Sequence, residues 1–306
     1  MALIDGLHNI GDAIREKTGT SDLIPFKDIP QAIRDIQSGG GTEEFETLID
    51  NSGVLDSTEG TVTEKVEQLI EKANKVDVVP YIKTARGLFA YAQSFPSKAV
   101  VDLQTATDVY QAFSYWNTEP IPIVEELTVN APNISVGNNQ ACMGQMFINN
   151  NGVKKVILNM PDESQYRVST FNQAKKIEEI VLNFSTKNIK EFNQTFGGCS
   201  ALKRIIGTFD FSSATNVNYM FSNCNNLEEL TFAPNTLSIS ISLPQSSKLT
   251  ADSVQSIIDG LATVTTAQTL TLNANAKILQ SQVDSANAKG WTVAGGTIVT
   301  EEEYYG

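Results

Sequence analysis

Phenylalanines recur at nearly constant spacing through the middle of the chain, and this periodicity constrains the fold more than any other feature. Four of them are separated by 24, 25 and 25 residues, and each is followed six and nine residues later by aliphatic residues with a polar pair between. One such unit cannot bury its own apolar side, so units must stack and pair their strands in parallel. The predicted core files are Phe147, Phe171, Phe196 and Phe221, and Ile180, Ile205 and Leu230.

Weaker copies of the unit precede these four. Phe89 and Phe113 are 24 residues apart, and the strand that belongs to Phe113 is predicted at residues 124–129. An insertion around Pro120 and Pro122 displaces that strand from its usual place. The sequence therefore predicts a solenoid of about six turns over residues 81–245, with the first two irregular.

A different, helical periodicity marks the N-terminal region. Apolar residues at helical spacing predict a helical hairpin over residues 1–37, which is too small to bury its own apolar faces. A Gly-rich linker and a further helix are expected over residues 38–80. The helix at residues 62–75 fits either a packing role or an oligomer-forming role, with packing favoured.

The C-terminal region, residues 246–306, is predicted to cap the last turn. Thr250 is expected to begin one helix, residues 274–289 to form a second, and residues 268–272 and 291–293 to form strands. The run Glu301–Glu303 is expected to be a solvated tail. The predicted fold class is therefore α+β: a repeat solenoid between a helical N-terminal module and an α/β C-terminal cap.

Composition and charge disfavour several functions. Acidic residues outnumber basic ones by 35 to 22, which argues against binding to nucleic acid. The single histidine, His8, removes His-based triads and most metal sites, so no catalytic residues, metal or cofactor are expected. No apolar run is long enough for a transmembrane helix, and the first residues do not resemble a secretion signal.

The repeat units carry a family resemblance. The string TNVNYMFSNCNNLEEL at residues 215–230 resembles the BspA-type leucine-rich repeat. That resemblance implies a surface or virion-borne binding protein without catalytic machinery. The string DAIREKTG at residues 12–19 is similar to a short helical module of phage tail and fibre proteins, which implies virion attachment. The closing segment from residue 249 also resembles BspA-like proteins encoded by phages.

Two groups of residues are candidates for specific roles. Tyr110, Tyr115 and Trp116 form a dense aromatic patch and are the predicted binding residues, although a core role is the alternative. Cys199 and Cys224 occupy equivalent places one turn apart. They fit either a disulfide or, as favoured here, two small buried residues that remain reduced.

The sequence thus favours a structural and binding component of a bacteriophage virion, made in the host cytoplasm and assembled into a tail fibre or baseplate. Residues 1–37 would dock onto other virion proteins, and the repeats would recognise a host surface protein or glycan. A homo-oligomer is expected, with a trimer as the first expectation, and no nucleic acid or membrane partner. The alternatives are a bacterial cell-surface adhesin and a depolymerase of cell-wall glycans.

Overall fold

The computed structural model describes residues 65, 75–78, 85–134, 144–162 and 169–305. The chain divides into two compact units, Met1–Val76 and Asp77–Gly306. The predicted helical hairpin of residues 1–37, most of the segment 38–80 and Cys142 lie outside the described residues.

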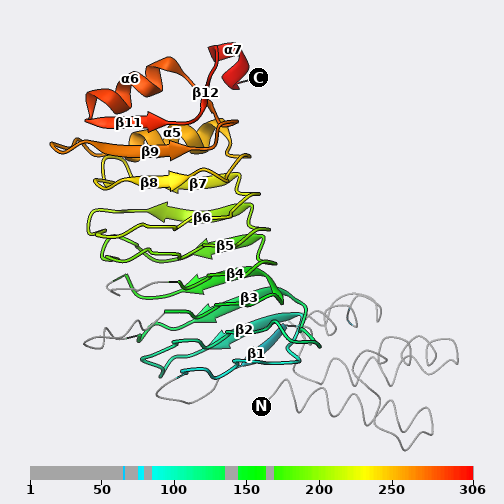
Figure 1. The fold of residues 1–306 in the computed structure, drawn as a ribbon. Helices are drawn as coiled ribbons and strands as arrows, with labels where there is room; N and C mark the ends of the chain where they lie inside the picture. The colour runs from blue at the N-terminus through cyan, green and yellow to red at the C-terminus, as the bar shows by residue number, and fades with distance from the viewer. Residues whose placement is uncertain (1–64, 66–74, 79–84, 135–143, 163–168, 306) are drawn as a thin grey trace, which may run out of the picture. The chain divides into compact units, whose positions relative to one another are not determined.

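The second unit is a parallel β-solenoid with few helices, so the solenoid prediction is confirmed and the α+β class is too broad a description. One sheet contains seven strands in chain order, one more than the expected six turns. Figure 1 shows them stacked as successive layers. The strands are β1 (Lys75–Val78), β2 (Lys98–Asp102), β3 (Val124–Asn130), β4 (Val153–Asn159), β5 (Glu179–Leu182), β6 (Arg204–Phe209) and β7 (Glu229–Phe232).

The repeat positions pair in register across these strands. Val156 lies opposite Ile180, and Ile180 lies opposite Ile205, all three being buried. Leu230 of β7 is also buried. The pattern breaks once, in β6, where a bulge shifts the register between Arg204 and Thr208. Gly207 lies in the bulge at φ +127°, and a Cβ there would approach the Leu182 carbonyl oxygen to 2.9 Å, so glycine is required.

A second stack precedes the strands in each turn and is built around the lead phenylalanines. Their rings are parallel within 19° and their centroids are 5.1–5.6 Å apart from one turn to the next. All but the first ring are fully buried. The file runs through Phe89, Phe113, Phe147, Phe171, Phe196 and Phe221, so it also includes the two weaker copies.

The backbone around each phenylalanine has an unusual conformation. The residues two before and two after it adopt positive φ in turn after turn, as Gln194 and Gly198 do around Phe196. The amides of Gln194, Phe196 and Gly198 donate to the next turn, to the carbonyls of Asn218, Met220 and Ser222, over 3.0, 3.0 and 2.7 Å. The other turns repeat this arrangement, so the amides at these alternate positions point toward the C-terminal end of the solenoid, whereas the amides between them donate within their own turn. We call these stacked segments the turn ladder.

Helix α5 (Ala251–Gly260) ends the main sheet. Thr250 caps it, as predicted, by accepting from the Ser253 amide. The side chain of Ser253 accepts from the Leu230 amide (3.1 Å) and that of Ser256 from the Phe232 amide (2.9 Å). Two serines of a helix thereby satisfy the free edge of β7, which would otherwise present unpaired groups.

The remaining elements form a small α/β assembly. Strands β8 (Ile241–Leu243), β9 (Gln268–Leu272) and β11 (Trp291–Ala294) make a parallel sheet with β9 in the centre. The predicted helix over residues 274–289 is wrong at its start, because Lys277–Ile278 pair as β10 with β12 (Thr297–Ile298) and α6 spans only Gln280–Ala288.

The chain ends in a short helix where a solvated tail was expected. The three glutamates are exposed, but they begin α7 (Glu301–Tyr305), in which Tyr304 is buried. The Tyr304 hydroxyl donates to the Ala251 carbonyl (2.6 Å) and accepts from Gln282 (2.8 Å). These bonds hold the end of the chain against α5 and α6.

Candidate functional site

Trp116, predicted to contribute to a binding surface, lies in the core. Its exposed fraction is 1%, and its indole Nε1 donates to the Phe89 carbonyl oxygen over 2.7 Å. A side chain this buried cannot contact a partner, so the prediction for Trp116 is wrong. The large ring occupies a place that the other turns fill with small residues, which is why an aromatic residue stands there without forming a surface.

That place, three residues after each lead phenylalanine, forms a buried ladder of hydrogen-bond donors. Asn150 Nδ2 donates to the Phe113 carbonyl (2.7 Å), as Cys199 Sγ does to Phe171 (3.0 Å) and Cys224 Sγ to Phe196 (3.1 Å). Trp116 belongs to the same series, whereas Ala174 has no side-chain donor. We call this series the donor ladder.

The two cysteines are therefore structural. Both are buried and unpaired as disulfides. Burial raises the pKa of the Cys199 thiol well above its ordinary value and that of Cys224 to about 12. A thiol with a raised pKa is a poor nucleophile and a poor metal ligand at neutral pH.

Tyr110 lies in a half-buried polar cluster. The Arg86 guanidinium lies 4.6 Å from the centre of its ring and also pairs with Asp108 at 2.8 Å. The Tyr110 hydroxyl donates to Gln145 Oε1 over 2.9 Å. These contacts fix the ring on the surface of the first turns.

Tyr115 stacks on an aromatic residue that the sequence analysis missed. The ring of Tyr91 lies 5.0 Å away and is parallel within 8°, and Tyr91 is 65% exposed. Both tyrosines follow a lead phenylalanine by two residues and have positive φ. That shared repeat position is the sequence signal that could have identified Tyr91.

Charged side chains form a second regular array, at the start of the strands. The pairs alternate in sign from β3 to β7: Glu125–Glu126, Lys154–Lys155, Glu178–Glu179, Lys203–Arg204 and Glu228–Glu229. Lys155 contacts Glu126 (3.1 Å) and Glu179 (3.2 Å), and Arg204 contacts Glu179 (2.6 Å). We call this array the charge ladder.

The ion pairs change the titration of the charge ladder. The hydrogen bonds that Lys155 donates to Glu126 and Glu179 raise the pKa of Lys155. Burial opposes ionisation of Glu179, but the hydrogen bonds from Arg204 and Lys155 outweigh it and lower its pKa. The charges from β3 to β6 are thus stabilised by neighbours in adjacent turns, which suits stacking rather than acid–base catalysis.

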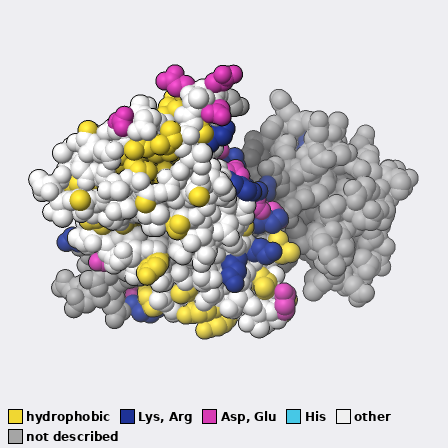
Figure 2. Space-filling model, turned by 45° about the horizontal axis from the view of Figure 1, so that its top comes forward, with side chains coloured by type: hydrophobic (Ala, Val, Ile, Leu, Met, Phe, Trp, Pro, Cys, Tyr) yellow, Lys and Arg dark blue, Asp and Glu magenta, His cyan; other side chains and the backbone are white. Residues whose placement is uncertain are grey.

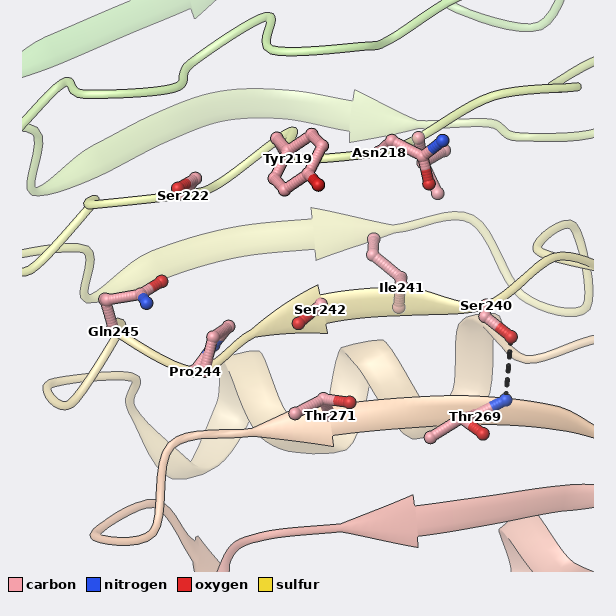
Figure 3. A pocket seen from close by; sticks show the side chains of 11 residues that line it. Asn218, Tyr219, Ser222, Ser240, Ile241, Ser242, Pro244, Gln245, Thr269 and Thr271 are labelled. Carbon is pink, nitrogen blue, oxygen red and sulfur yellow. Dashed lines mark hydrogen bonds between the residues drawn. The ribbon is translucent and has the colours of Figure 1, made fainter.

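A groove lies where the turn ladder meets β8. Its volume is about 470 Å³, and it is bounded by Tyr219 and its neighbours on one side and by β8 on the other (Figure 3). A smaller hollow of about 210 Å³ adjoins it, and Tyr219 and Ser222 line both. The sequence analysis did not predict this groove.

The face shown in Figure 2 is largely uncharged. In the view of Figure 2, charged side chains gather along one side and at the top, and polar uncharged groups and backbone cover most of the rest. In the part of the chain that the structure describes, no cluster of His, Cys, Asp or Glu could hold a metal ion. No helix among these residues is long and apolar enough to cross a membrane.

The comparison with protein families gives one match. Residues 141–236 match the family described as "Mycoplasma protein of unknown function, DUF285". The match covers the four most regular turns and fits a BspA-like repeat protein. No curated protein and no solved structure matches the chain significantly.

Proposed function

We propose that this protein is a structural and binding component of a bacteriophage virion, in a tail fibre or baseplate. The repeat region would display a recognition surface for a host protein or glycan, and residues 1–37 would attach the chain to the particle. The observation that carries the proposal is the Tyr91–Tyr115 stack on a regularly repeated scaffold, in which Tyr91 is exposed and Tyr115 is half-buried. Stacked turns fix such rings in place, so little conformational entropy is lost on binding.

Two further observations support display rather than catalysis. The charge ladder pairs its own charges, and the buried cysteines are held as thiols. The resemblance of residues 12–19 to a helical module of phage tail proteins supports attachment through the N-terminus.

Deletion of residues 1–41 tests the attachment. The truncated protein should remain folded and soluble but should no longer oligomerise or enter particles, as measured by light scattering and by immunolabelling of purified virions. The matched control is the full chain with Tyr91→Ala and Tyr115→Ala, which should enter particles but reduce adsorption to host cells. Normal assembly of the truncated chain would contradict the proposal and direct attention to residues 62–75.

An enzymatic role is tested separately. Purified full-length protein incubated with host wall polysaccharide should release no reducing ends. Release above that of a heat-denatured control would favour the depolymerase alternative.

A further inference from the structure

The turn ladder ends at the turn of Phe221 with its donors unsatisfied. In the preceding turn, the amides of Gln194, Phe196 and Gly198 donate to the turn that follows. The equivalent amides of Tyr219, Phe221 and Asn223 have no hydrogen-bond partner among the described residues. Since all bonds of the ladder run in one direction, these three N–H groups point past the last turn.

The next layer is β8, and no backbone hydrogen bond joins it to this row among the described residues. β8 is an edge strand that pairs only with β9. The edge of an extended strand presents N–H and C=O groups alternately, whereas the last turn offers N–H groups alone. The two layers therefore stay apart, and the groove of Figure 3 lies between them.

The walls of the groove are uncharged and combine apolar with polar groups. Hydroxyl groups of Ser242, Thr269 and Thr271 lie along the β8–β9 side, as Figure 3 shows. The adjoining hollow adds the carboxamides of Asn172, Gln173, Gln194 and Asn223. Neither lining contains a charged side chain.

Tyr219 lies where the two hollows meet and is 68% exposed. A tyrosine ring combines a flat apolar face with a polar tip, so it can cover one face of a sugar ring. Carboxamides and hydroxyls both donate and accept hydrogen bonds, which matches the hydroxyls of a sugar. The row of backbone N–H groups can donate to the oxygen atoms of such a ligand.

Other ligand classes fit less well. An anionic polymer would meet no positive side chain in the groove, and the chain carries a net charge of −13, which repels polyanions. A peptide could add to the free edge of β8. Its opposite edge would present N–H groups as well as C=O groups to a row of N–H groups, so only part of that row would find acceptors.

We propose that this groove binds a neutral oligosaccharide, with Tyr219 stacking on one sugar ring and the free amides donating to its oxygens. This inference rests on the proposed display function and adds to the Tyr91–Tyr115 stack a second site with its own ligand class. The volume of the groove, about 470 Å³, lies in the ordinary range for small-ligand sites.

Binding of defined glycans to the full-length protein tests the inference. The probes are maltohexaose, cellohexaose, mannohexaose and N-acetylchitohexaose, with hexagalacturonate as the anionic counterpart, measured by isothermal titration calorimetry. At least one neutral probe should bind, and Tyr219→Ala should weaken it at least about tenfold. Ser242→Phe, which fills the groove from an exposed position, should have the same effect.

Tyr305→Ala is the matched control, because Tyr305 is 70% exposed but lines neither the groove nor the adjoining hollow, and it should leave the affinity unchanged. Thermal melting should show that all three variants remain folded. Binding of none of the neutral probes, preference for hexagalacturonate, or unchanged affinity in both groove variants would overturn the inference.

Particle incorporation is measured independently. A chain that enters virions but binds no glycan refutes only the groove, and one that binds but never enters virions refutes only the virion role.

Discussion

At the scale of single residues, the donor ladder shows one structural task performed by unlike side chains. The carbonyls of Phe171 and Phe196 already accept from an amide of their own turn, as Phe196 does from Cys199. The side-chain donor from the following turn bonds to the second lone pair of the same carbonyl oxygen. Both lone pairs of a buried carbonyl are then hydrogen-bonded. The sequence predicted a small buried residue at this place. It could not reveal that Trp116 takes the same place in the second turn. The position requires a side chain that can donate a hydrogen bond, and it does not require a small one.

Asn150 is expected to be the most sensitive polar residue of the donor ladder. It is fully buried, and besides donating to Phe113 its Oδ1 accepts from the amides of Gly152 (3.0 Å) and Val153 (3.1 Å). Asn150→Ala leaves three buried groups without partners, at a cost on the order of 3 kcal/mol. Chemical denaturation measures this. Asn149→Gly, at a positive-φ position, should change stability by less than about 1 kcal/mol. Equal effects of the two variants would contradict the expectation.

Phe196 is the corresponding test for the phenylalanine file. Its ring is stacked between Phe171 and Phe221, with centroids 5.6 Å away on either side. Phe196→Ala opens a cavity between two turns and should lower the free energy of unfolding by about 3–5 kcal/mol. The matched variant Phe95→Ala removes a partly buried phenylalanine outside the file and should cost less. A loss no greater than that control would show that the file contributes little.

At the scale of elements, the regular strands were predictable and the short ones were not. The strand after Phe113 was placed correctly despite the insertion at Pro120, because its aliphatic pattern survives. β10 was missed since a two-residue strand has no periodicity of its own and depends on pairing with β12. α7 was missed because three glutamates look like a solvated tail. Its formation depends on the burial of Tyr304, a tertiary contact.

The capping of β7 by α5 makes a prediction at this scale. Ser253 and Ser256 accept from the β7 amides of Leu230 and Phe232, and Ser253 also donates to the Glu228 carbonyl (3.0 Å). The double variant Ser253→Ala/Ser256→Ala should lower stability by about 2–4 kcal/mol, because buried strand groups lose their partners. Hydrogen exchange should show faster exchange at Leu230 and Phe232. Ser285→Ala, exposed on α6, is the control and should change neither. Unaltered exchange in the double variant would show that the serines do not protect the edge.

At the scale of the whole molecule, the groove forms where the last repeated turn is followed by a different kind of layer, the strand β8. A periodic sequence pattern does not describe that change. The repeat pattern shows only that the array ends after Phe221. It does not reveal that the next layer is an extended strand whose hydrogen-bonding pattern differs from that of the turn ladder. The candidate tyrosines were only partly predictable for a similar reason. Tyr115 and Tyr91 become one feature only when the turns are stacked.

The charge ladder extends over five strands and makes the stability of the solenoid depend on pH. The hydrogen bond from Lys203 lowers the pKa of Glu178, and Arg204 and Lys155 lower that of Glu179 against the effect of burial. A carboxyl whose pKa is lower in the folded state binds its proton more readily in the unfolded state. Its stabilising contribution is present at neutral pH and is lost as the pH falls through the folded-state pKa, below the ordinary value of 4.5.

The free energy of unfolding should therefore decline as the pH is lowered from about 5 to about 3, and added salt should weaken the effect. Glu178→Gln/Glu179→Gln removes the two titrating groups, so the variant should be less stable at neutral pH and lose less stability on acidification. Urea denaturation at a series of pH values measures both. Glu302→Gln, exposed in α7 and without an ion pair among the described residues, should follow the unmodified chain. If the double variant shows the same pH slope as the unmodified chain, the acid sensitivity arises elsewhere and the alternation of charge does not stabilise the stack.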